Sequence, residues 1–165
     1  MTSPDINRRT FLIGAGLGSA ALLTGSFNFM SPVRAQSSLP ATRSMRGGSN
    51  NYRPNAPLVD NLGTGFLVHG TVRRAGAGEP LANLRIQIWA ATARGGEREP
   101  SNHGSVLTAS DGSFQLEMSQ IVPNFGQPHA HLAYDDGDFE TVFLRPVMSS
   151  RSDTSVQAHF VLAAA

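Results

Sequence analysis

Apolar and polar residues alternate along most of the chain after residue 58. The segment 66–72 carries an apolar residue or glycine at every second position, and 84–89 and 114–118 repeat the same period. A period of two places alternate side chains on opposite faces of a strand, so each segment is expected to bury one face. A last segment of this kind is 156–162, and no stretch sustains helical spacing for three turns. The pattern therefore predicts an all-β domain.

Turn sequences separate several of these candidates. A Ser-Asp-Gly turn at 110–112 follows the candidate 106–108, and an acidic turn with glycine at 135–138 follows the candidate 131–134. Such residues are typical of tight turns between antiparallel strands, so we expect a β-hairpin at each position. Seven or so short strands in about 105 residues predict a β-sandwich or a small barrel.

The first residues are typical of an export signal. Arg8 and Arg9 directly precede the uncharged run 11–30, which glycines dilute, and Val-Arg-Ala at 33–35 forms a small-x-small cleavage pattern. This order is typical of a twin-arginine signal peptide, which predicts export to the periplasm or medium. An uncleaved membrane anchor is the alternative. Residues 1–35 are thus expected to be a signal rather than part of the fold.

Composition limits the remaining possibilities. The 165 residues suffice for one domain, expected at 58–165 after a linker or arm at 36–57 without apolar periodicity. The formal charge is +1, and all thirteen basic residues are arginine, so nucleic-acid binding is not expected. Cysteine is absent, which excludes disulfides, thiolate metal sites and cysteine nucleophiles. No phosphate loop, dinucleotide fingerprint or nucleophile elbow is present either.

The triplet His129-Ala130-His131 is the most informative chemical feature. Residues i and i+2 of a strand share a face, so the two imidazoles are expected side by side and able to hold one cation. An ordinary polar pair is the alternative interpretation. The loop 94–104 carries further candidate ligands, namely His103, Glu97 and Glu99. Two imidazoles with a third imidazole or a carboxylate suit iron, copper or zinc.

Several segments resemble, in order and spacing, the intradiol ring-cleavage dioxygenases. The most specific are the Ile-Trp strand and the Pro-His-x-His strand, and the likeness spans about residues 50 to 163. The segments are 52–57, 70–72, 79–89, 108–114, 128–132 and 156–162. The resemblance implies an antiparallel β-sandwich of about seven to eight strands. It also implies the insertion of both atoms of O₂ into a catecholic diol, and assembly as a homo-oligomer, as is common in the family. After cleavage of the signal, no stable membrane association is expected.

The family holds non-haem Fe(III) with two tyrosines and two histidines, and the resemblance assigns the histidines to His129 and His131. The tyrosine positions fall on Glu97 and Phe125, and Gln127 or Gly126 replaces an arginine. Phenylalanine cannot ligate a metal, so the sequence departs from the family pattern at this point.

A metal site without the two tyrosines would use His129, His131 and His103 with Glu97 or Glu99 as ligands. Copper or zinc is the alternative to iron in such a site. Substrate contacts are expected at Tyr52, Gln127 and Phe125. The sequence thus favours an exported metal-dependent dioxygenase. The alternative is a catalytically degenerate sandwich that serves as a metal-binding or interaction module in the cell envelope.

Overall fold

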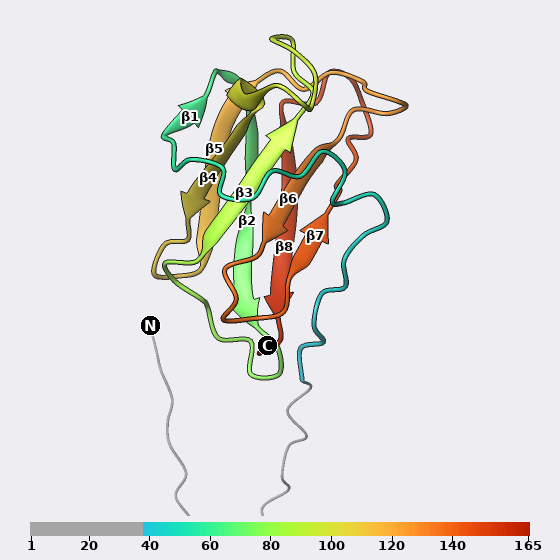
Figure 1. Cartoon of the computed structure of the whole chain (residues 1–165). Coiled ribbons are helices and arrows are strands. Elements are labelled where there is room, and N and C mark those ends of the chain that lie inside the picture. The colour runs from blue at the N-terminus through green and yellow to red at the C-terminus, as the bar shows by residue number, and fades with distance from the viewer. Residues whose placement is uncertain (1–37) are drawn as a thin grey trace, which may run out of the picture. The chain divides into compact units, whose positions relative to one another are not determined.

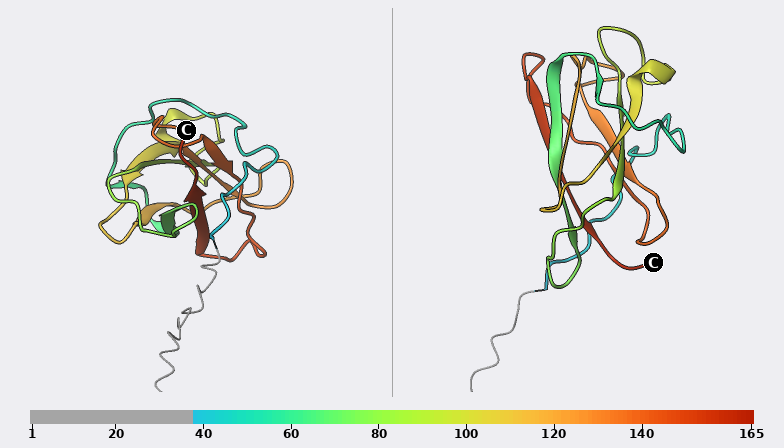
Figure 2. Two further views of the ribbon diagram at one scale, coloured as in Figure 1. Left: turned by 90° about the horizontal axis from the view of Figure 1, so that it is seen from below. Right: turned by 90° about the vertical axis from the view of Figure 1, so that its left-hand side faces the viewer.

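The computed structural model describes residues 38–165, which form two four-stranded β-sheets packed face to face (Figures 1 and 2). The first sheet has the order β1-β5-β2-β8, and the second has the order β4-β3-β6-β7. The strands are β1 (Asn61–Leu62), β2 (Gly65–Arg74), β3 (Arg85–Ala90), β4 (His103–Leu107), β5 (Ser113–Ser119), β6 (Ala130–Tyr134), β7 (Val142–Leu144) and β8 (Ser155–Leu162). A 3-10 turn, η1 (Pro100–Asn102), precedes β4. The predicted all-β sandwich is confirmed, and the signal predicted for residues 1–35 lies outside the described residues.

The core lies between the two sheets. Strands β5 and β8 bury every second residue, as their two-residue period predicts, and leave the other face of the first sheet to solvent. Large side chains from both sheets meet in the interior: Phe66, Val68, Ile86, Ile88, Leu116, Met118, Leu132, Phe160 and Leu162. Within residues 38–165 no helix is long and apolar enough to cross a membrane.

The two central strands of the second sheet, β3 and β6, are buried on both faces. Every residue of β6 is buried, as are all residues of β3 except the half-buried Arg85. The cause is the segment 38–57, which runs across the outer face of this sheet (Figure 1). Its backbone accepts hydrogen bonds from the sheet: Asn50 O from Trp89 Nε1 at 2.9 Å, and Gly48 O from His131 Nδ1 at 2.9 Å. Polar side chains on this face of the sheet are therefore enclosed, so the face can hold a buried polar site.

The hairpin predicted around residues 110–112 is wrong. Strands β4 and β5 belong to different sheets, so this turn carries the chain from one layer to the other. The two-residue period shows only which side chains point inward, and strands on opposite sheets satisfy it as well as paired strands do. The hairpin predicted at 135–138 is confirmed, since β6 and β7 pair antiparallel with Tyr134 opposite Val142. Two other pairs, β1 with β5 and β2 with β8, run parallel.

Candidate metal centre

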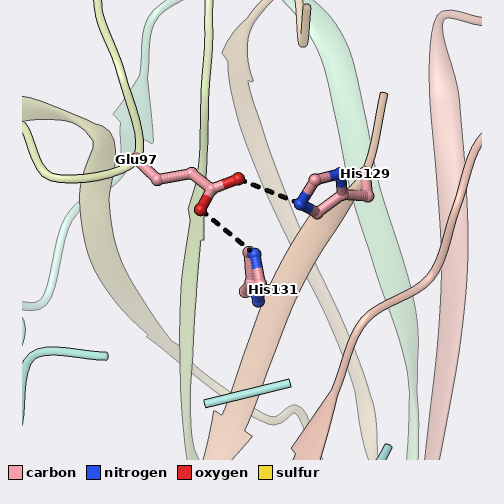
Figure 3. Close-up of side chains that lie close together, drawn as sticks. All are labelled: Glu97, His129 and His131. Atoms are coloured by element: carbon pink, nitrogen blue, oxygen red, sulfur yellow. Dashed lines mark ion pairs between the residues drawn. The ribbon is translucent and has the colours of Figure 1, made fainter. Parts of the chain in front are cut away.

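Glu97, His129 and His131 converge on the covered face of the second sheet (Figure 3). Oε1 of Glu97 lies 2.9 Å from Nε2 of His129, and Oε2 lies 3.5 Å from Nε2 of His131. All three side chains are at most 5% exposed. His131 is in β6, His129 directly precedes that strand and bridges to Val147, and Glu97 comes from the loop between β3 and η1. The two rings project toward the same carboxylate, as the i and i+2 spacing predicts.

Backbone carbonyls determine which nitrogen of each ring carries its proton. Nδ1 of His131 lies 2.9 Å from Gly48 O, and Nδ1 of His129 lies 2.8 Å from Gln127 O. A carbonyl oxygen only accepts hydrogen bonds, so each Nδ1 is the donor and each Nε2 has a free lone pair in the neutral ring. The guanidinium of Arg145, 3.3 Å from Nδ1 of His129, also only donates and therefore makes no hydrogen bond to this protonated nitrogen.

The free acceptor atoms face one another in a buried space. Oε1 of Glu97 and Nε2 of His131 have no hydrogen-bond partner. Buried acceptors without a donor destabilise a fold, whereas a cation bound among Glu97, His129 and His131 would satisfy both atoms. Ligand atoms about 2.1 Å from one ion lie ~3.0 Å apart at a right angle and ~3.4 Å apart at a tetrahedral angle. The separations of 2.9 and 3.5 Å, which join each histidine to a different oxygen of Glu97, are close to these values. One ligand atom from each residue lies within 4.8 Å of the other two, so the three residues fit a metal ion.

The Glu97 carboxylate is kept ionised by its surroundings. Burial acts to raise its pKa. The side-chain amides of Asn124 and Asn51, followed by the charges of the two histidines, act the other way and leave the pKa below its ordinary value. The Asn51 amide donates to Oε2 at 2.7 Å. The site therefore offers an anionic oxygen ligand held in one orientation.

Burial has the opposite effect on the pKa of the His131 imidazole. It is the main reason why the pKa of His131 lies below its ordinary value, in spite of the hydrogen bond to Gly48 O. A lower pKa keeps His131 neutral, and the neutral ring is the form that ligates metals.

His103 lies next to this cluster and is not part of it. Its Nε2 is 2.6 Å from the backbone oxygen of Glu97, so this nitrogen donates to the carbonyl and is not available to a metal. The ring of Trp89 is stacked between His103 and His131, at centroid distances of 5.8 and 5.1 Å and with planes within 8°. The other candidate carboxylate, Glu99, is exposed and lies outside the cluster.

A cavity of about 320 Å³ opens beside Glu97 and His129. Phe125 stands at its rim with 98% of its surface exposed. Of the other predicted substrate contacts, Tyr52 packs against Trp89 and Phe143, and Gln127 contributes its carbonyl to His129; neither lines the cavity. The lining consists of Asn50, Asn51, Glu97, Arg98, Asn124, Phe125, His129 and Arg145.

Sequence reasoning missed several of these groups. Arg145 follows β7 and is separated from the histidine pair by a hairpin, so only the pairing of β6 with β7 brings it to the cavity. Gly48 and Gln127 act through backbone carbonyls, which leave no side-chain signal in the sequence. Asn51 and Asn124 are common loop residues, and neither was distinguished from its neighbours.

Comparisons with known proteins identify the fold. Neither a protein-family model nor a curated protein matches the chain. The dioxygenase domain of a dioxygenase and carbohydrate-binding protein fusion from Streptomyces sp. SirexAA-E is 20% identical, with a TM-score of 0.57 over 76% of this chain and 99% of that one.

Two further solved structures are similar. The 3-chlorocatechol 1,2-dioxygenase from Rhodococcus opacus 1CP is 17% identical, with a TM-score of 0.56 over 79% of this chain and 75% of that one. The hydroxyquinol 1,2-dioxygenase from Pseudomonas putida DLL-E4 is 16% identical, with a TM-score of 0.58 over 79% and 69%. At these identities the likeness shows the fold alone, and the chain has the β-sandwich of these ring-cleaving dioxygenases.

Proposed function

We propose that this protein is an exported, iron-dependent dioxygenase that reacts a small catecholic diol with O₂. One observation carries the proposal: the buried side chains of His129, His131 and Glu97 converge beside a cavity, and neither Oε1 of Glu97 nor Nε2 of His131 has a hydrogen-bond partner. They do so on the fold of dioxygenases that are named for 3-chlorocatechol and hydroxyquinol. Iron is the ion for which both the donor set and the O₂ chemistry are suited.

The residues of the chain have distinct roles in this proposal. His129, His131 and Glu97 would hold the iron, which when bound would supply a Lewis acid for the diol oxygens and a redox-active centre for O₂. The positive charges of Arg98 and Arg145 line the cavity and favour the ionised form of a diol. The exposed ring of Phe125 offers an aromatic surface at the entrance.

Export and assembly belong to the same proposal. The paired arginines Arg8 and Arg9 before an uncharged run support passage through the twin-arginine route, which carries folded proteins. Replacement of both by lysine is expected to retain the protein in the cytoplasm, as cell fractionation would reveal. Assembly into a homo-oligomer and release from the membrane after cleavage stay predictions.

The second candidate is a metal-binding module without turnover. The observation that favours it is the absence of tyrosine at the two positions where the resemblance expects phenolate ligands, occupied here by Glu97 and Phe125. Such a module would bind a metal at the same three residues and consume no oxygen.

Oxygen consumption by the purified exported protein distinguishes the two candidates. The protein is loaded with iron without air and then given catechol, chlorocatechol or hydroxyquinol in an oxygen electrode. Uptake of one O₂ per ring-cleaved product supports the dioxygenase, and stoichiometric metal without uptake supports the module. His129→Ala is expected to abolish uptake. His69→Ala, on β2 of the other sheet, is the matched control.

A further inference from the structure

We infer that the iron of this site is ferrous, in contrast to the Fe(III) that the resemblance implies. The inference rests on the proposed function and specifies the chemistry of the same site. It begins with a count of anionic ligands. Of the three converging side chains, only Glu97 is an anion, because each histidine carries its single proton on Nδ1 and ligates as a neutral ring.

No phenolate is placed to supply more negative charge. The chain has two tyrosines. Tyr134 is fully buried on the opposite face of β6, inside the sandwich. The hydroxyl of Tyr52 accepts a hydrogen bond from Gln87 at 3.2 Å, and its ring packs against Trp89. Neither tyrosine belongs to the cluster, so among residues 38–165 the Glu97 carboxylate is the only anionic ligand that the cluster offers to an ion.

The charge of the surroundings adds to this effect. With one carboxylate, Fe(III) would leave a net charge of +2 in a buried site, whereas Fe(II) would leave +1. The cations that line the adjoining cavity are Arg98 and the half-buried Arg145, whose Nη2 is 3.3 Å from Nδ1 of His129. Uncompensated charge is strongly disfavoured in a poorly solvated site, so the less charged ion is preferred.

The arrangement of the ligands leads to the same conclusion. His131 lies near the start of β6 and His129 directly precedes that strand, while Glu97 reaches them from the loop between β3 and η1 (Figure 3). Two histidines and one carboxylate with open positions are typical of non-haem Fe(II) oxygenases. The cavity borders Glu97 and His129, so substrate can approach the site from that side. The chain therefore combines the fold of the intradiol enzymes with a donor set suited to ferrous iron.

Metal binding and spectroscopy test the inference independently of turnover. The exported protein, stripped of metal, is titrated with Fe(II) without air and then exposed to nitric oxide. We expect one Fe(II) per chain and the S = 3/2 electron paramagnetic resonance signal of a ferrous nitrosyl complex. Protein that retains Fe(III) in the presence of ascorbate, or that shows a visible tyrosinate absorption band, would overturn the inference.

Variants of the single anionic ligand provide a second test. Glu97→Gln is expected to weaken Fe(II) binding at least 100-fold, whereas Glu99→Gln, a neighbouring exposed carboxylate, leaves it unchanged. Glu97→Tyr introduces a phenolate and is expected to shift preference toward Fe(III), with a new visible band. Equal Fe(II) affinity in Glu97→Gln and the unmodified protein would exclude Glu97 as the anionic ligand.

The outcomes separate this inference from the proposed function. Oxygen uptake with a stable Fe(III) centre would retain the dioxygenase and reject the ferrous site. An Fe(II) centre with the nitrosyl signal but without oxygen uptake would retain the ferrous site and reject the dioxygenase. Failure to bind iron in either state would reject both.

Discussion

The imidazole of His103 donates a hydrogen bond to the backbone oxygen of Glu97, with 2.6 Å between Nε2 and the carbonyl oxygen. While His103 holds the backbone of this residue, the Glu97 side chain points away toward His129 and His131 (Figure 3). Strand β4 thereby fixes the loop that supplies the carboxylate. This contact gives His103 a positioning role rather than that of a metal ligand.

His103→Ala is expected to lower metal affinity about tenfold, the usual effect of removing a group that orients a ligand. The stoichiometry of one metal per chain is expected to remain, because the three ligands are intact. His103→Gln is expected to recover most of the affinity, since its amide nitrogen can donate to the same carbonyl. Calorimetric titration of the three proteins measures both quantities. Loss of stoichiometric binding in both variants would show that His103 is itself a ligand.

The sequence was sufficient to predict the sandwich and the orientation of the histidine pair. In both cases the signal is a two-residue period, which a single strand expresses without help from its neighbours. The strands β5 and β8 and the pair His129 and His131 are predicted correctly for this reason. The two-residue period does not show which strands pair with each other. The placement of β4 and β5 in different sheets and the parallel pairing of β2 with β8 were therefore not predicted.

The surroundings of the site could not be predicted for a different reason. The protons of His129 and His131 are fixed by the carbonyls of Gln127 and Gly48, and any residue supplies a carbonyl. Gly48 is 83 positions from His131 in the sequence. Contacts of this kind depend on the path of the covering segment, which local periodicity does not describe.

Gly48→Ala is expected to displace the covering segment from the second sheet. A Cβ at this position would lie 2.8 Å from the backbone oxygen of Phe143, where no real Cβ fits without movement. Movement of Gly48 weakens the hydrogen bond that orients His131, so we expect about tenfold weaker metal binding. Ser49→Ala, at an exposed neighbouring position, is the control and is expected to bind metal normally. Identical metal affinity in the two variants would contradict this role for the covering segment.

Gly70→Ala is expected to destabilise the sandwich severely without a direct effect on the site. Gly70 lies where β2 pairs with β8, and a Cβ there would overlap the backbone oxygen of Ala158. The two atoms belong to the paired strands β2 and β8, so the overlap can be removed only if these strands move apart. We expect this to lower the free energy of unfolding by about 3 kcal/mol or more. The measurement is the free energy of unfolding in denaturant. Gly96→Ala, where no atom lies within 4 Å, is the control and is expected to change stability far less.

Asp135→Asn is expected to stabilise the protein at neutral pH and to have little effect in acid. Burial, with the charge of Asp136 as a second cause, raises the pKa of Asp135 above its ordinary value of 3.8. The unfolded chain therefore loses this proton at lower pH than the folded protein does. The stability that the protonated carboxyl contributes is complete below about pH 3.8 and is lost as the pH rises through the folded-state value.

Asp135→Asn removes this unfavourable ionisation. It also keeps a side-chain oxygen that accepts the hydrogen bond from Gln87, whose Nε2 lies 2.6 Å from Oδ1 of Asp135. The group is partly exposed, so the expected gain at pH 7 is small, about 0.5 kcal/mol. Denaturant unfolding between pH 3 and pH 8, with a chelator present to exclude metal binding, measures the difference between variant and unmodified protein. That difference should grow with pH, whereas Glu140→Gln, at an exposed position, should show no such trend. A gain that is equally large at pH 3 would mean that the charge of Asp135 is not its cause.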